Sequence, residues 1–210
     1  MRKWFAVPII VGLLCGCFIP QVYDTTQHSL LYLPAEDLRA KGLAFITPTA
    51  ITGQEEEKQA VALLFTEVLK KERPAMRCVS LPEALNALTE AGLADDYKRL
   101  LQGYRETGIF DRAILRKVGE ATKTGYVAQL KLMIFSQGSQ DRFGALGLRM
   151  IMTKSAHLRL FLQIWNVEDG LIAWEGVQEM HYAVDTVTEN SVALKTAMER
   201  AAHAFISRLP

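Results

Sequence analysis

Apolar and polar residues alternate strictly through most of the second half of the chain. Four stretches show this period of two: residues 126–136, 146–154, 157–166 and 171–184. In the third stretch, Leu158, Leu160 and Leu162 all fall on one side. Such spacing is typical of strands that bury only one face. The pattern therefore predicts four half-buried strands.

The first half of the chain follows the helical period instead. Predicted helices span residues 54–72, 82–90, 95–105 and 111–121, and the same spacing returns at residues 190–208. Ser80 and Glu83 form a capping box ahead of the second helix, and Pro74 ends the first. Two short apolar runs, residues 43–46 and 75–79, flank the first helix and predict buried strands.

The turn before the last strand indicates a register for the final hairpin. Residues 168–170 (EDG) supply the turn, and a three-residue loop keeps the apolar faces of both strands on the same side. This register sets Ile164 opposite Trp174 and Arg159 opposite Glu179. The second pair joins opposite charges on the outer face, which favours the same register.

Most predicted helices lie in the first half of the domain, and most predicted strands lie in the second half. The predicted order is β-α-β-α-α-α-β-β-β-β-α. A mixed, mainly antiparallel sheet with helices packed on one face satisfies this order, so the predicted fold class is α+β (mixed α/β). Residues 43–210 form a single globular domain in this interpretation, because a chain of this length suits one sizeable core.

The N-terminus carries a different pattern. Arg2 and Lys3 precede an almost wholly apolar run, residues 4–14, which is too short for a transmembrane helix. A basic start, a short apolar run and small residues are typical of a secretory signal peptide, predicted here over residues 1–16. A buried N-terminal helix is the alternative.

The end of the apolar run resembles the lipobox of bacterial lipoproteins. In Leu14-Cys15-Gly16-Cys17, the last cysteine occupies the position that is acylated (palmitate among the chains) and becomes the new N-terminus. The resemblance implies three acyl chains on Cys17, which is more than stable anchoring requires. Phe18 after the cysteine favours the outer membrane over the inner one. Residues 17–42 then form the lipidated N-terminus and a tether.

Charge and cysteine content narrow the classes of partner. The chain has a formal net charge of +1, so no basic excess indicates nucleic acid. With Cys15 removed and Cys17 acylated, Cys78 is left alone and cannot form an intramolecular disulfide. A buried core thiol is the favoured interpretation, and a reactive thiol is the alternative.

Catalytic and cofactor motifs are not evident in the sequence. His157 and His181 face each other in the register above, which allows a metal site, although a solvated pair is favoured. The other two histidines, His28 and His203, have no histidine or cysteine at ligand spacing. The polar segment 138–144 joins two predicted strands, not a strand and a helix N-terminus, as a phosphate loop would. We therefore expect no enzyme, cofactor or metal site.

The outer faces of the predicted strands are partly apolar. Met133, Phe135, Phe161 and Trp165 fall on odd positions, opposite the predicted core face. Methionine and aromatic residues are enriched at the centres of protein interfaces. These four residues are therefore a candidate interface. A second layer of helices over that face is the alternative.

Two segments of the domain resemble one periplasmic superfamily. Residues 118–127 (VGEATKTGYV) and residues 160–175 (LFLQIWNVEDGLIAWE) are similar to its recurring strand elements. The superfamily includes the TolB N-terminal domain, the curli secretion lipoprotein, LpoB and PelC. Asn166 and Glu168 stand where the family often has aspartate, and Thr124-Gly125-Tyr126 replaces Ala-Asp-Tyr. The resemblance implies a TolB N-terminal-domain-like fold and no active residue.

These features together predict a non-enzymatic outer-membrane lipoprotein on the periplasmic face. It would act as a scaffold or assembly component in envelope biogenesis or export, with envelope proteins as partners and a possible homo-oligomer. The alternatives are a tethered activator or adaptor of an envelope synthase and, third, a ligand-binding periplasmic domain. A membrane pore is disfavoured because Lys131, Arg149 and Arg159 lie on the outer face.

Overall fold

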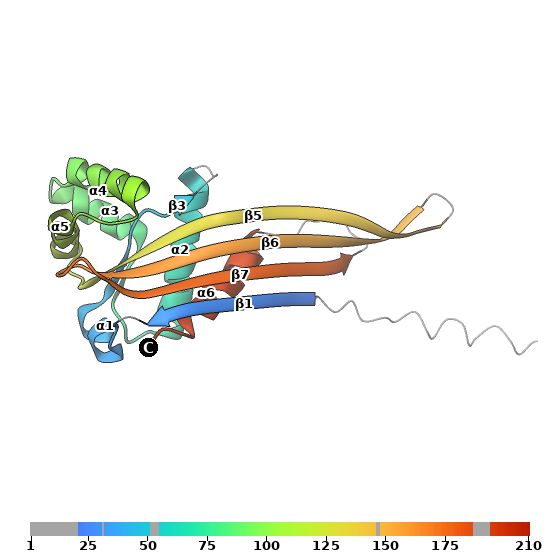
Figure 1. The fold of residues 1–210 in the computed structure, drawn as a ribbon, viewed down its shortest axis with the longest axis horizontal. Coiled ribbons are helices and arrows are strands. Elements are labelled where there is room, and N and C mark those ends of the chain that lie inside the picture. The colour runs from blue at the N-terminus through green and yellow to red at the C-terminus, as the bar shows by residue number, and fades with distance from the viewer. Residues whose placement is uncertain (1–20, 31, 51–54, 146–147, 187–193) are drawn as a thin grey trace, which may run out of the picture.

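The computed structural model describes residues 21–30, 32–50, 55–145, 148–186 and 194–210. Its strands are β1 (Gln21–Leu30), β2 (Leu43–Phe45), β3 (Thr49–Ala50), β4 (Cys78–Val79), β5 (Tyr126–Ala145), β6 (Leu148–Asn166) and β7 (Ile172–Thr186). Its helices are α1 (Ala35–Lys41), α2 (Glu55–Glu72), α3 (Leu81–Glu90), α4 (Ala94–Thr107), α5 (Arg112–Thr122) and α6 (Leu194–Ile206). The predicted α+β class is therefore confirmed (Figure 1).

All seven strands join one mixed sheet in the order β1-β7-β6-β5-β2-β4, with β3 also paired to β5. The long strands β1, β7, β6 and β5 are antiparallel to one another, whereas β2 and β3 pair in parallel with β5, and β4 pairs in parallel with β2. The sheet is thus mainly antiparallel, as predicted. None of the described helices is long and apolar enough to cross a membrane.

Helices pack on both faces of the sheet at one end, not on the single face that was predicted. On one face, α2 and α6 cover a core that includes Leu130, Leu162 and Trp174. On the other face, α3, α4 and α5 cover a second core that includes Val127 and Trp165. At this end the strands carry apolar side chains on both faces of the sheet. Both faces therefore need a layer of helices to bury them.

The predicted tether over residues 17–42 is wrong for most of its length. β1 pairs with β7 along ten residues, and α1 follows it with Leu38 buried in the core. The segment reads as a tether because β1 is largely polar and only its pairing with β7 makes it a strand. Residues 1–20, and with them the predicted signal peptide and Cys17, lie outside the described residues.

The strand prediction needs one further correction. Residues 146–154 and 157–166 were predicted as two strands, but β6 runs through Ser155 and Ala156 without a break. The registers that the turn implied are confirmed: Ile164 pairs with Trp174, and Arg159 with Glu179. Gly170 closes the turn at a positive φ of 73°, a conformation that glycine adopts without strain.

Part of the sheet projects beyond the helices (Figure 1). Among the side chains whose burial the structure describes, the outermost core residues on the long strands are Leu158 of β6 and Met180 of β7. We call the paired strands beyond this row the arm. It comprises residues 21–23, 136–145, 148–157 and 181–186. β5 and β6 have 20 and 19 residues, against a usual strand length of about 5–6, and the excess length forms the arm.

Candidate functional site

Trp165 is not part of an exposed interface. Its side chain is only 3% exposed, because helices cover this face of the sheet. Its ring meets Phe110 edge-on at a centroid distance of 5.0 Å and Tyr104 at 6.4 Å. The alternative prediction, a second helix layer, is therefore correct for this residue. The covering residues belong to α4 and the segment before α5, which periodicity alone does not place over the sheet.

A bulge in β5 changes the register position of Phe135. Leu132 pairs with Leu160 but Ile134 pairs with Arg159, so Met133 is an extra residue in β5. A bulge shifts the alternation by one position. Phe135 therefore occupies a register position opposite Leu158, a core residue, and its side chain lies outside the described residues.

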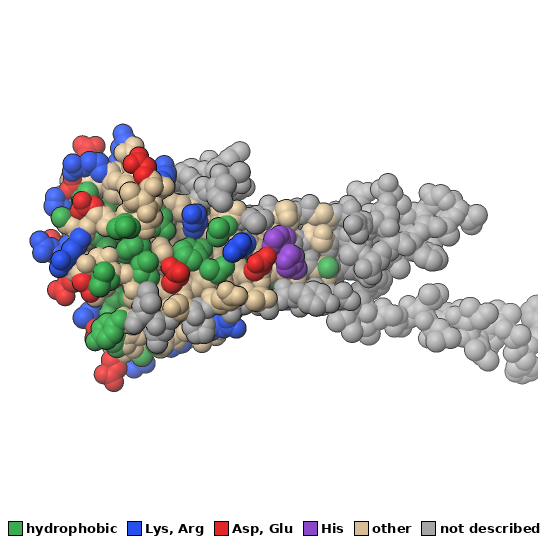
Figure 2. All heavy atoms as spheres, in the orientation of Figure 1, with side chains coloured by type: hydrophobic (Ala, Val, Ile, Leu, Met, Phe, Trp, Pro, Cys, Tyr) green, Lys and Arg blue, Asp and Glu red, His purple; other side chains and the backbone are tan. Residues whose placement is uncertain are grey.

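Phe161 and Met133 remain partly exposed. Phe161 lies in register between Lys131 of β5 and Val177 of β7, and all three side chains are half-buried. Met133 is half-buried at the bulge. This stretch of the face lies beyond the α3–α5 layer, next to the arm. Figure 2 shows hydrophobic, basic and acidic side chains mixed across the sheet here.

A hydrogen-bonded chain separates the covered part of this face from the open part. The Tyr104 hydroxyl donates to Gln163 Oε1 at 2.9 Å, and Trp165 Nε1 approaches the same oxygen at 3.3 Å. Gln163 Nε2 donates to Glu175 Oε2 at 2.7 Å. Burial raises the pKa of Tyr104 to about 12, so the phenol is neutral and acts as a donor. This network anchors α4 to the sheet.

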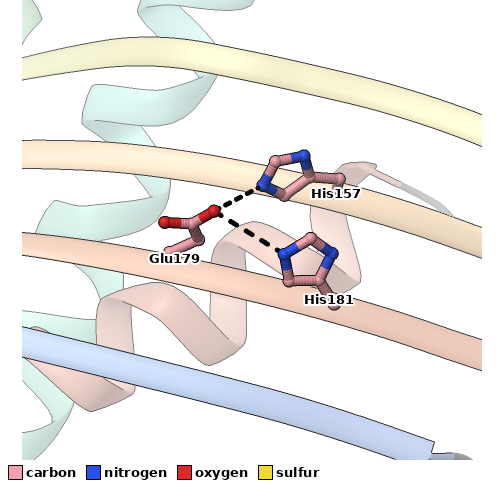
Figure 3. A group of neighbouring side chains, drawn as sticks. All are labelled: His157, Glu179 and His181. Carbon is pink, nitrogen blue, oxygen red and sulfur yellow. Dashed lines mark hydrogen bonds and ion pairs between the residues drawn. The ribbon is translucent and has the colours of Figure 1, made fainter.

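Two histidines and a carboxylate meet where the arm begins (Figure 3). His157 of β6 pairs with His181 of β7, which confirms that they face each other as the sequence predicted. Their rings stack with centroids 4.0 Å apart and planes 13° apart. Glu179 lies two residues before His181 on the same face, and its Oε1 lies 3.0 Å from His157 Nε2 and 3.6 Å from His181 Nε2.

Glu179 was not among the sequence-predicted site residues. The signal was present, because a residue two positions from His181 on a strand shares its face. The hydrogen bond from His157 lowers the pKa of the Glu179 carboxyl, and the nearby positive charge of Arg159 lowers it further. Arg159 pairs with Glu179 across the strands. The carboxylate is therefore ionised at neutral pH and faces both imidazoles.

Two hollows lie at the helical end of the molecule. A cavity of about 460 Å³ is bounded by α1, α5 and the β6–β7 turn, with Lys41, Arg116 and Lys123 beside Glu120 and Glu168. A smaller one of about 190 Å³ lies between α1 and the C-terminus. Neither is lined by a histidine or cysteine. Their charges are of both signs, so neither selects an anionic or a cationic ligand.

Cys78, the remaining predicted core thiol, is half-buried and packs against the core. Burial raises its thiol pKa to about 12, which keeps it protonated at neutral pH. A protonated thiol is a poor nucleophile, so the structure favours the core interpretation over the reactive one.

No family model and no curated protein matches the chain. Solved structures give matches at low identity. A PelC dodecamer from Paraburkholderia phytofirmans with one substitution has a TM-score of 0.47 and 10% identity, covering 91% of this chain and 98% of its own. Lipoprotein GNA1162 from Neisseria meningitidis has a TM-score of 0.38 and 9% identity, covering 80% and 96%.

The C-terminal domain of LpoB from Escherichia coli has a TM-score of 0.36 and 14% identity, covering 66% of this chain and 82% of its own. PelC and LpoB both belong to the superfamily that the sequence resembles. The likeness concerns the fold.

Proposed function

We propose that this chain is a lipid-anchored, non-enzymatic assembly protein of the cell envelope, with the arm as its contact surface. The observation that carries the proposal is the arm itself. A strand pair normally buries one face against another layer. Here the sheet continues past the last core row, at Leu158 and Met180, without a helix of the described residues over it.

The edges of the arm support a role in protein contact. β1 is the last strand of the sheet on one side. On the other side, the described residues of β2 and β3 pair with β5 as far as Leu132. Beyond that residue, no described strand lies along the outer edge of β5. Unpaired edges present rows of N–H and C=O groups that can pair with another chain.

The predicted anchor places the arm near the membrane. Residues 18–20 alone separate Cys17 from β1, so the two ends are at most about 15 Å apart. β1 begins in the arm, where Gln21 pairs with Ala183, and ends over the core, where Leu30 pairs with Trp174. The acylated end and the arm therefore lie on the same side of the domain.

This arrangement favours a scaffold over a far-reaching activator. An activator that meets an envelope synthase at a distance needs a long flexible tether, and β1 and α1 take up most of the predicted one. An activator that acts beside its own membrane is still compatible with the geometry. It is therefore the second candidate, and its partner would contact the same arm.

Site-specific photo-crosslinking in cells tests the proposal. A photoreactive amino acid replaces Ser136 at the start of the arm on β5, or Gln27 on the exposed edge of β1. Ile109, which is 64% exposed on the helical body, is the matched control position. We expect crosslinked envelope proteins or a second copy of the chain from Ser136 and Gln27, and not from Ile109.

The same experiment separates the candidates. Crosslinks to a second copy support a self-assembling scaffold, and crosslinks to an envelope enzyme support the adaptor. If Ser136 in the arm and Gln27, which lies on the β1 edge outside the arm, both yield no more product than Ile109, the contact role of the arm and of this edge is refuted. Replacing Cys17 with serine should release the chain from the membrane fraction, and retention on the membrane would contradict the lipid anchor.

A further inference from the structure

The histidine pair at the base of the arm has a third partner that makes it a candidate metal site. From the geometry we infer that His157, His181 and Glu179 bind a divalent transition-metal ion of the zinc type. The three residues come from adjacent strands, and one ligand atom from each lies within 4.8 Å of the others. The inference does not depend on the proposed function, because it concerns only this part of the sheet.

The residue types select the class of ion. Two imidazole nitrogens and one carboxylate oxygen suit zinc, copper, nickel or iron, whereas calcium and magnesium prefer oxygen ligands alone. Three protein ligands leave at least one position for water. His181 and Glu179 are 57% and 39% exposed and His157 is 27% exposed, so solvent reaches the site.

The spacing of the donor atoms is close to what zinc requires. Zinc bonds of about 2.0–2.2 Å place neighbouring donors roughly 3.2–3.6 Å apart in a tetrahedral site. Glu179 Oε1 already lies 3.0 Å from His157 Nε2 and 3.6 Å from His181 Nε2. Figure 3 shows both Nε2 atoms turned toward this oxygen. The β6–β7 ladder holds the backbone, and the two stacked rings must turn their in-plane nitrogen lone pairs toward a common point to bind one ion.

Both stacked rings would bind a metal ion in their neutral form.

Neighbouring charges limit the affinity. Arg159 pairs across the strands with Glu179, and Lys131 lies one row further toward the helices on the same face. Both repel a cation. We expect binding in the micromolar range. Replacing Arg159 with glutamine should tighten it roughly tenfold, the equivalent of removing one charge at short range.

Isothermal titration calorimetry with ZnCl₂ at neutral pH tests the inference. The protein is the full-length chain in detergent micelles with Cys15→Ser and Cys17→Ser, so that these two thiols do not act as ligands. We expect one zinc ion per chain. His157→Ala and His181→Ala should each weaken binding at least tenfold, since even outer-shell changes at metal sites weaken it that much. Arg159→Gln should strengthen it.

His203→Ala is the matched control. His203 contacts Glu72 through Nδ1 and so forms a histidine–carboxylate pair without a second histidine. Its loss should leave zinc binding unchanged. Zinc should raise the melting temperature of the parent chain and of His203→Ala, but not of His181→Ala. Circular dichroism confirms that each variant is folded.

Two results would overturn the inference. One is the absence of saturable zinc binding at millimolar concentration in the parent chain and in Arg159→Gln. The other is binding that persists unchanged after His157 and His181 are both replaced. The crosslinking test of the arm does not require zinc. A failure of the zinc experiment therefore leaves that test unaffected.

Discussion

At the residue scale, one tryptophan decides between two interpretations of the outer face. Trp165 packs against Phe110 and Tyr104 and is almost fully buried. Trp165→Ala should therefore lower the free energy of unfolding by about 3–5 kcal/mol, through lost burial and the cavity that remains. Urea unfolding measures this change. Ile109→Ala on the exposed body should change it by less than about 0.5 kcal/mol.

A loss of stability below about 1 kcal/mol in Trp165→Ala would contradict the burial of this side chain. An exposed tryptophan at a protein contact would instead leave the isolated chain stable and change only its association. A buried tryptophan therefore predicts a loss of stability in the Trp165→Ala chain, and an exposed one predicts a change in association alone.

Tyr104 should give the fold a dependence on alkaline pH. Its phenol is held neutral, with a pKa of about 12 in the folded chain against about 10 when unfolded. A raised pKa means that the folded state binds the proton more tightly. The contribution of Tyr104 is therefore complete below pH 10 and is lost as the pH rises from 10 to 12.

Urea unfolding of the parent and of Tyr104→Phe across this pH range checks the prediction. The difference in unfolding free energy between the two chains should be constant at neutral pH and shrink above pH 10. A difference that stays constant up to pH 12 would mean that Tyr104 titrates normally.

At the scale of elements, the bulge in β5 makes an uncommon deletion tolerable. Met133 is the extra residue, so its removal leaves Leu132 opposite Leu160 and Ile134 opposite Arg159. We expect the Met133 deletion to keep its circular dichroism spectrum and to melt within a few degrees of the parent. Deletion of Ala128, in the regular part of β5, should unfold the chain because it turns core residues to the wrong face.

If both deletions are equally damaging, the bulge does not set the register of β5. If both are tolerated, the strand slips freely and the register is weakly fixed.

Two glycines in different elements should respond in opposite directions to alanine. A Cβ on Gly176 of β7 would lie 2.5 Å from the Trp174 ring and 2.9 Å from the Phe205 ring, which pack together at 5.9 Å. Gly176→Ala should lower stability by about 1–3 kcal/mol. Gly103 of α4 has open space around it, so Gly103→Ala should raise stability by about 0.5–1 kcal/mol.

Thermal melting of the two variants and of the parent shows whether each substitution raises or lowers the melting temperature. Equal destabilisation would contradict the packing at Gly176 or the open helix surface at Gly103.

Local pattern was enough for most elements and for the final hairpin. Helices α2 to α6 and the register at Ile164 and Trp174 follow from periodicity, capping and turn length, which act over a few residues, whereas α1 was not predicted. β1 does not, because its polar sequence becomes a strand only when β7 lies beside it. The same holds for Phe135, whose face depends on a bulge that no alternation reveals. For the candidate metal site, the sequence indicated the histidine pair but not Glu179.

At the scale of the whole molecule, the helices are gathered at one end and the arm at the other (Figure 1). Two apolar cores on opposite faces hold the helical end rigid. The rigidity of the arm depends on strand pairing and on contacts with a bound partner. Hydrogen exchange should therefore be slow in residues 126–132 and faster in residues 136–145 of the same strand. Binding of a partner to the arm should slow exchange in the second group alone.

The pairing of β1 with β7 also has a mechanical consequence. β1 runs from the arm toward the core, so tension on Gln21 directed away from the helical end acts along the strand axis. All ten residue pairs between β1 and β7 then share the load in shear, and they do not separate in succession. Pulling from the opposite terminus of β1, at Leu30, would peel them in sequence. A single-molecule stretching experiment should find a much higher rupture force when the chain is held by residue 21 than by residue 30. A protein drawn through its N-terminus by a moving membrane would keep its fold under such tension.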